Sequence, residues 1–339
     1  MTLLGNTPTP DSPTTQPSPT TSPTTGTTPP APQSRLARRT ALAALAAATA
    51  AFAVAACSKG EGGSDRLTIA AGEPGGFYLE FAQLLAAQLN LAGVAKEVVV
   101  LPTLGSKDNL RLLQDRKTDL ALSLADAVSP NPQVKALGRV YENYLQCVVR
   151  ADSTYKTLAD LAGTRISAGA AGSGAALTAA RILTTVGVDC TVDHLLLEQA
   201  TKSLESRGIA AMFWSGGVPT STLDKLSQRV PLRLIPLDGP LPALRRTYGP
   251  VYQDVRVPAG VYRGTAPVKV AGIPNLLLCR PDLPVATARR VVETLVRRAS
   301  NLVPPSAVGA QFLNLQSLVV SAPIDLHTGA IQQYRRMYG

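Results

Sequence analysis

The sequence has few of the side chains that carry out acid–base, nucleophilic or metal chemistry. Its 339 residues include only two histidines and four cysteines. Neither His194 nor His327 stands at a spacing typical of zinc ligands, and no nucleophile elbow, P-loop or HExxH run occurs. Ser173 lies between two glycines, but GAAGSGA does not fit the elbow spacing. We therefore predict that the protein is not an enzyme and that it uses no metal ion and no cofactor.

Aromatic residues are also scarce, at 4% of the chain, although the formal net charge is +10. Nucleic-acid binding usually needs a concentrated basic stripe with aromatics, whereas the basic residues here are scattered. We expect no nucleic-acid partner, and the charge favours an anionic membrane surface or anionic solutes. After Cys57 the cysteine count is odd, with no paired spacing, which argues against a disulfide framework. A single bridge among Cys147, Cys190 and Cys279 stays open.

The N-terminal part of the sequence is predicted to lie outside the folded domain. Residues 1–33 are rich in Thr, Pro and Ser and are predicted to be disordered. Residues 34–56 combine Arg35, Arg38 and Arg39 with a 16-residue apolar stretch, too short to span a membrane, and so predict an export signal. Small residues before Cys57 resemble a bacterial lipobox, which implies acylation of Cys57, for example by palmitate. A signal without lipidation is the alternative, and the export route, twin-arginine or general secretory, stays open.

Three glycine-rich turns lead straight into helix starts. They are Gly75-Gly76-Phe77-Tyr78, Gly105-Ser106-Lys107-Asp108-Asn109 and Gly172-Ser173-Gly174. The first N–H groups of a helix lack intrahelical partners and carry the positive end of the helix dipole. Glycine lets a ligand approach those donors closely, so each turn can hold an anion. Three such turns predict a polar ligand held among several helix ends.

The mature chain alternates strand and helix patterns. The expected strands are LTIAAG, KEVVVLPT, LALSLA, YLQCVVR, RISAGA, HLLLEQ, IAAMFW, LRLIPL and VKVAGIPNLLLC. The expected helices cover residues 78–90, 106–116, 174–186, 201–207, 220–228 and 285–299, and dense Pro and Gly over 231–267 predict irregular connections. This alternation indicates an α/β fold with mainly parallel sheets.

Several motifs, in order, give the chain a family resemblance. They are LTIAAGEPGGFYLEFAQLLA, LGSKDNLRLLQDRKTDLALSLADAV, LADLAGTRISAGAAGSGAALTAARIL, FWSGGVPT and LHTGAIQQYRRMYG. Together they resemble the TAXI family of solute-binding proteins, the extracytoplasmic receptors associated with tripartite TRAP transporters. The resemblance implies a type II periplasmic-binding-protein-like fold, with two α/β lobes and a ligand cleft between them. Lobe 1 would comprise 66–150 and 266–339, lobe 2 would comprise 151–265, and 57–65 would be a lipidated linker.

The resemblance also implies which residues bind the ligand. They are Gly76, Phe77, Tyr78, Ser106, Asn109, Ser173, Gly174, Trp214, Gly217 and Pro219. The chain departs from the family pattern at Phe77 and Ala125, where two hydroxyl groups are missing, and at Thr328, which replaces a proline. Structural roles compete at several positions: helix N-capping for Ser106 and Ser173, a bond within its own turn for Asn109, and core packing for Tyr78 and Trp214. Asp126 is interpreted as structural.

The function implied is an extracytoplasmic solute-binding lipoprotein, anchored to the cell membrane by lipid at Cys57. It would capture a small carboxylate or an amino acid and deliver it to a TRAP-type membrane permease, acting as a monomer. The alternative is a lipoprotein sensor that feeds a membrane signalling kinase. No motif fixes the identity of the ligand.

Overall fold

The computed structural model describes residues 64–130, 132–305, 307–308 and 313–339. The Thr/Pro-rich tract, the export signal and Cys57 lie outside the described residues, so the expectations placed on them remain predictions. Within the described ranges, no helix combines the length and apolar character needed to cross a bilayer.

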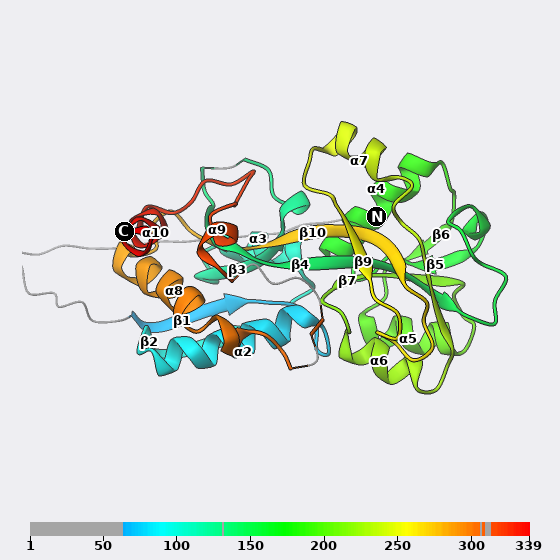
Figure 1. Cartoon of the computed structure of the whole chain (residues 1–339), viewed down its shortest axis with the longest axis horizontal. Coiled ribbons are helices and arrows are strands. Elements are labelled where there is room, and N and C mark those ends of the chain that lie inside the picture. The colour runs from blue at the N-terminus through cyan, green and yellow to red at the C-terminus, as the bar shows by residue number, and fades with distance from the viewer. Residues whose placement is uncertain (1–63, 131, 306, 309–312) are drawn as a thin grey trace, which may run out of the picture. The chain divides into compact units, whose positions relative to one another are not determined.

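The described strands form one mixed, ten-stranded sheet (Figure 1). Their bounds are β1 Ser64–Ala70, β2 Ala95–Leu101, β3 Leu120–Leu124, β4 Lys135–Arg150, β5 Arg165–Ser167, β6 Thr191–Asp193, β7 Ala211–Gly216, β8 Leu232–Ile235, β9 Gln253–Val257 and β10 Val268–Cys279. The order along the sheet is β2-β1-β3-β10-β4-β7-β5-β6, with β8 beside β4 and β9 beside β10. The α/β class expected from the sequence is confirmed.

The two long strands β4 and β10 connect two groups of parallel strands. The first part of β4 pairs with β10, whereas its last residues, Tyr144 to Arg150, pair with β7 and β8. The last part of β10 pairs with β3 and its first part with β9. One group is therefore β2-β1-β3 and the other β7-β5-β6, and Figure 1 shows β4 and β10 running from one group to the other.

The expectation of mainly parallel sheets is wrong, because β4 and β10 run antiparallel to every strand beside them. Nearly all of β4 is buried, and burial on both faces is also typical of parallel strands. The direction of such a strand cannot be read from its sequence. Strand β10 has the bounds expected, whereas β4 begins nine residues before the expected Tyr144.

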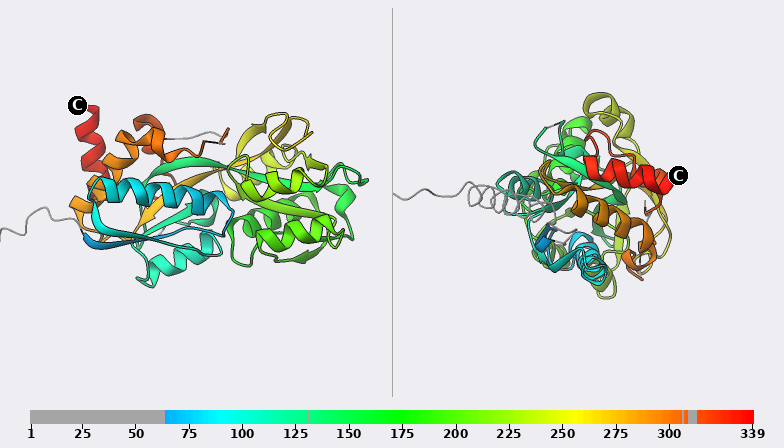
Figure 2. Two further views of the ribbon diagram at one scale, coloured as in Figure 1. Left: turned by 90° about the horizontal axis from the view of Figure 1, so that it is seen from below. Right: turned by 90° about the vertical axis from the view of Figure 1, so that its left-hand side faces the viewer.

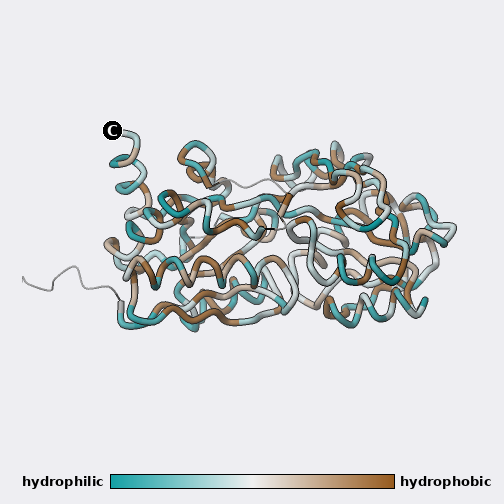
Figure 3. The backbone as a smooth tube through the Cα atoms, turned by 60° about the horizontal axis from the view of Figure 1, so that its bottom comes forward, coloured by the Kyte–Doolittle hydropathy of each residue, from teal (hydrophilic) through white to brown (hydrophobic). Residues whose placement is uncertain are grey.

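Helices cover both faces of the sheet. Their bounds are α2 Phe77–Leu91, α3 Ser106–Gln114, α4 Gly174–Val186, α5 Leu197–Glu205, α6 Ser221–Ser227, α7 Leu241–Tyr248, α8 Val285–Arg297, α9 Leu315–Leu318 and α10 Thr328–Tyr338, with 3₁₀ turns η1 Ala125–Ala127, η2 Ala159–Leu161 and η3 Ala299–Leu302. In the left view of Figure 2, α2 and α3 lie on opposite sides of strands β1 to β3. Hydrophobic and hydrophilic residues alternate around the helical turns in Figure 3, as expected of helices that bury one face.

Two local predictions fail in the second half of the chain. HLLLEQ is not a strand, because helix α5 begins inside it at Leu197. The start of this helix is fixed by a distant side chain: the Leu197 N–H donates to Glu73 Oε2 over 2.7 Å. The stretch 231–267 is not wholly irregular either, since it contains α7 and β9.

Glu142 is a buried acid in the middle of β4, only 2% exposed. Arg139 Nη2 donates to its Oε2 over 3.1 Å, and its Oε1 has no hydrogen-bond partner in the described residues. On the neighbouring strand β10, a Cβ at Gly272 would lie 2.7 Å from Oε1. Burial penalises the carboxylate more than Arg139 stabilises it, and so raises the pKa of Glu142 to about 7.

This shift predicts a pH dependence of stability. The pKa of Glu142 is about 7 in the folded chain against 4.5 for an ordinary glutamate, so between these values the folded state binds more protons than the unfolded state. Its contribution to stability is therefore complete below about pH 4.5 and is lost as the pH rises through about 7. Glu142→Gln should remove this pH dependence. Between pH 5 and pH 8 the free energy of unfolding of the variant should therefore rise relative to that of the wild type by up to roughly 3 kcal/mol.

Urea unfolding at several pH values measures this difference. The exposed Glu97, 61% accessible in its side chain, provides the control: Glu97→Gln should give a stability profile parallel to the wild type. A Glu142→Gln profile that also runs parallel to the wild type would contradict the assignment.

Candidate functional site

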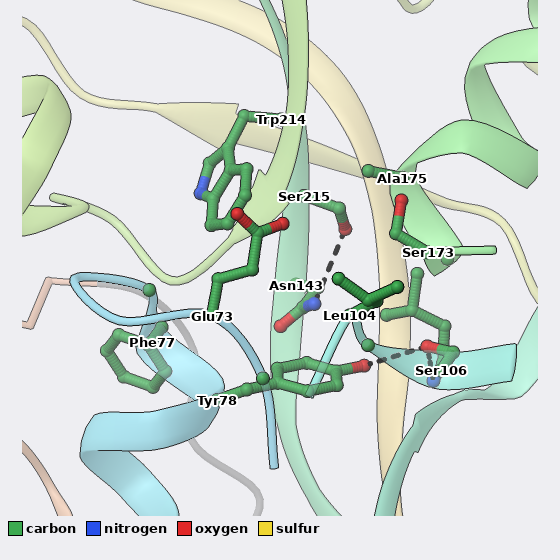
Figure 4. A pocket seen from close by; sticks show the side chains of 15 residues that line it. Glu73, Phe77, Tyr78, Leu104, Ser106, Asn143, Ser173, Ala175, Trp214 and Ser215 are labelled. Atoms are coloured by element: carbon green, nitrogen blue, oxygen red, sulfur yellow. Dashed lines mark hydrogen bonds between the residues drawn. The ribbon is translucent and has the colours of Figure 1, made fainter. Parts of the chain in front are cut away.

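A cavity of about 40 Å³ lies where the turns after several strands meet (Figure 4). One water needs about 10–15 Å³ by this measure, so the space suits a small ligand. The lining residues are Gly72, Glu73, Gly76, Phe77, Tyr78, Leu104, Gly105, Ser106, Leu124, Asn143, Ser173, Gly174, Ala175, Trp214 and Ser215. Several of them follow or end parallel strands, which is the usual place for ligands in α/β sheets.

The three glycine turns singled out in the sequence come together at this cavity. The Lys107 N–H donates to the Gly172 carbonyl over 3.2 Å, which joins the second turn to the third. A Cβ on Gly105 would lie 3.5 Å from Ser173 Cβ. The first turn is tied to helix α6, because Ser221 Oγ donates to the Gly75 carbonyl over 3.2 Å. The turns beside β1 and α3 therefore touch elements that belong to the other group of strands.

The two candidate capping serines have different roles. Ser173 is the N-cap of α4, and its Oγ accepts from the Ala176 N–H over 3.0 Å, as predicted. The competing N-cap role does not hold for Ser106, because the N-cap of α3 is Gly105, whose φ of 109° is readily adopted only by glycine. Ser106 Oγ accepts instead from the Leu124 N–H at 3.1 Å and lies 3.3 Å from the Tyr78 hydroxyl.

The start of α4 presents backbone donors to the cavity. Gly174 and Ala175 both line it, and the first N–H groups of a helix have no intrahelical acceptor. Ser173 Oγ takes up only the next N–H, that of Ala176. This part of the wall is therefore electropositive and suits a carboxylate.

Aromatic side chains form another part of the wall. Trp214 packs on Gly76, where a Cβ would lie 3.1 Å from the indole ring. Its Nε1 donates to Thr220 Oγ1 over 3.0 Å, so the polar atom of the ring is already satisfied. Phe77 and Tyr78 line the cavity and also pack against Tyr141. Core packing and cavity lining are thus combined in the same side chains.

Of the ten expected ligand-binding residues, seven line the cavity: Gly76, Phe77, Tyr78, Ser106, Ser173, Gly174 and Trp214. The other three, Asn109, Gly217 and Pro219, are not among its lining residues. Asn109 is fully buried, and its amide donates to the carbonyls of Ala71 and Leu122. A Cβ on Gly217 would overlap the ring of Phe77, so the absence of a side chain at Gly217 leaves room for this ring.

Three polar lining residues escaped the sequence interpretation: Glu73, Asn143 and Ser215. Glu73 is 8% exposed, and burial raises the pKa of its carboxyl although the Leu197 N–H partly offsets this. Asn143 is 1% exposed, with its Nδ2 3.3 Å from Ser215 Oγ. Two sequence signals could have pointed to Glu73 and Asn143. Glu73 is an acid between Gly72 and Pro74, and Asn143 lies inside the buried run VYENYLQCVV, where a polar group needs a partner.

The remaining candidates have structural roles. Asp126 accepts hydrogen bonds from Thr178 Oγ1 at 2.7 Å and from the Tyr252 hydroxyl at 3.1 Å, and it lies 3.5 Å from Arg181 Nη1. His327 is the N-cap of α10, where its Nδ1 accepts from the Gly329 N–H over 3.0 Å. Among the described residues no group of three or more His, Cys, Asp or Glu side chains could hold a metal ion.

Comparisons with known proteins give a family and similar folds. A family model described as the NMT1-like family matches residues 69–337. A solved structure of a protein from Bordetella bronchiseptica RB50 is similar in fold, with 13% identity, 81% of this chain and 99% of that chain covered, and a TM-score of 0.52. The substrate-binding protein of an amino acid ABC transporter matches at 10% identity and a TM-score of 0.47, covering 70% of this chain and 95% of its own. The effector-binding domain of QuiR in complex with shikimate matches at 11% identity and a TM-score of 0.47, with 70% and 98% covered.

Proposed function

The chain belongs to the NMT1-like family, and from this membership and the cavity we propose that it is a solute-binding receptor rather than an enzyme. The observation that carries the proposal is a small cavity to which turns from both groups of strands contribute. Gly105, Ser106 and Leu124 come from one side, and Ser173, Gly174 and Trp214 from the other. A ligand held there contacts both sides at once.

The two groups of strands would act as two lobes, 66–150 with 266–339 and 151–265. Strands β4 and β10 connect them, and bending of these strands would open and close the cavity. A ligand that contacts both lobes only in the closed arrangement shifts the population towards that arrangement. The contact between Lys107 and Gly172 is the kind that would form on closure.

The physiological setting follows from the sequence motifs. Their resemblance to the TAXI family supports a receptor for a TRAP-type permease, held at the outer face of the cell membrane by lipid at Cys57. The ligand would be a small carboxylate or an amino acid, with its carboxylate at the start of α4. The lobes would close over the solute, and the closed receptor would then dock on the permease.

Thermal-shift measurements on the purified full chain, against a panel of small carboxylates and amino acids, test the proposal. We expect a subset of the panel to raise the unfolding temperature in proportion to the logarithm of ligand concentration. Isothermal titration calorimetry of the positive compounds then gives stoichiometry, with one site expected. A folded protein that is stabilised by no member of the panel would count decisively against a receptor for such solutes.

A further inference from the structure

The cavity wall contains an acid without a basic partner. Among the lining residues that the structure describes, Glu73 is the only one with a carboxylate side chain, and none is Lys, Arg or His. Its Oε2 accepts from the Leu197 N–H at 2.7 Å, the one hydrogen bond found for this carboxylate among the described residues, and burial disfavours its charged form. A buried carboxylate that has a single neutral donor is costly unless a positive charge approaches it.

A second acceptor lines the same cavity without a partner. Asn143 is 1% exposed, and its Oδ1 has no hydrogen-bond partner among the described residues, while its Nδ2 lies 3.3 Å from Ser215 Oγ. The Ser215 hydroxyl can donate or accept, so either orientation of the amide leaves one of its polar atoms for a ligand. In Figure 4, Glu73 and Asn143 project into the space between Trp214 and Tyr78.

Donors lie at another part of the wall, at the start of α4. Gly174 and Ala175 line the cavity there, on an element of the other strand group from the one that carries Glu73. The cavity therefore has acceptors at Glu73 and Asn143 and donors at the start of a 13-residue helix. A plain carboxylate satisfies only the donors and leaves the Glu73 carboxyl without a positive partner.

We propose that Glu73 is the counter-ion for a positively charged group of the ligand, so that the cavity selects a small zwitterion with a primary ammonium group. This inference rests on the proposed function and narrows its ligand class. A primary ammonium offers three N–H donors, which suits two acceptors such as Glu73 Oε1 and Asn143 Oδ1. The cavity volume of about 40 Å³ favours an α-amino acid with a small side chain.

The hydrogen bond of Glu73 to helix α5 does not prevent the carboxylate from pairing with a ligand ammonium. The bond to Leu197 uses Oε2, and the ligand would use Oε1. The same carboxylate thereby connects the ligand to the first turn of α5, an element of the second strand group. An ammonium at Glu73 would stabilise the charged carboxylate and with it this connection.

Pairs of ligands that differ in one group test the proposal on the wild-type protein. Isothermal titration calorimetry on the full chain should show that L-alanine, or whichever amino acid of the panel binds most tightly, binds at least tenfold more tightly than its 2-hydroxy acid counterpart. Trimethylglycine should bind at least tenfold more weakly than glycine, because it has no N–H donor. Equal binding within either pair would overturn the inference and leave the proposed receptor function intact.

Glu73→Gln keeps the shape of the side chain and its hydrogen-bond acceptor but removes the charge. We expect the preference for the amino acid over the hydroxy acid to fall to within about twofold. The control is Glu198→Gln, which removes an exposed carboxylate from the first turn of helix α5, where Glu198 pairs with Lys202. This variant should keep the full preference. If Glu73→Gln lowers both affinities equally and preserves their ratio, Glu73 is only structural and the inference fails. If no solute binds to the wild type at all, the receptor function itself fails.

Discussion

Gly174→Ala is expected to weaken solute binding by about tenfold or more while the protein still folds. A Cβ at this position would lie 2.6 Å from Leu124 Cδ1 and 2.6 Å from Ser106 Oγ, which belong to the other strand group. Overpacking of this kind costs typically about 1–3 kcal/mol. Because an opened cavity would separate these atoms, the cost should fall mainly on the closed, ligand-binding arrangement.

Calorimetric titration with a solute identified by the thermal-shift panel measures this effect. The matched control is Gly239→Ala, at a glycine where a Cβ would meet no atom within 4 Å and where no positive φ is required. This control should bind as the wild type does. If Gly174→Ala binds normally, the two strand groups do not have to approach this closely for binding. A second outcome is that the variant lowers the free energy of unfolding of the ligand-free protein by as much as it weakens the free energy of binding. In that case the close approach belongs to the folded state in general.

The parts of the site that depend on local sequence could be predicted. A glycine turn followed by a helix start is visible within four or five residues, and the three turns at Gly76, Ser106 and Ser173 all reach the cavity. Helix α4 has the bounds expected, because its N-cap Ser173 and its C-cap Gly187, with φ of 66°, are both local signals. Strand β10 was equally clear as a long apolar run.

The parts that depend on distant contacts could not be predicted. The start of α5 is fixed by Glu73, 124 residues away in the chain. The apolar residues of HLLLEQ therefore do not indicate that a helix begins there. Ser106 resembles an N-cap locally, yet its hydroxyl is drawn to the Leu124 N–H of a neighbouring strand. The direction of β4 depends on which strands lie beside it. In each case the deciding partner is supplied by the tertiary structure.

Asn109→Ala is expected to lower the free energy of unfolding by about 3 kcal/mol or more. The Asn109 amide donates to the Ala71 carbonyl at 2.6 Å and to the Leu122 carbonyl at 2.7 Å, and its Oδ1 accepts from Thr103 Oγ1 at 2.6 Å. Alanine would leave these partners without their bonds in a place where Asn109 itself is fully buried. Each polar group left unsatisfied on burial costs about 1–3 kcal/mol.

Urea unfolding of this variant beside Asn90→Ala, an exposed position on α2, separates structure from ligand contact. The control should stay within about 0.5 kcal/mol of the wild type. Because the bonds of Asn109 join the turn after β1 to strand β3, the loss should appear as lower stability, with solute affinity of the folded fraction kept within about threefold. Unchanged stability with lost affinity would instead make Asn109 a ligand contact, as the family resemblance implies.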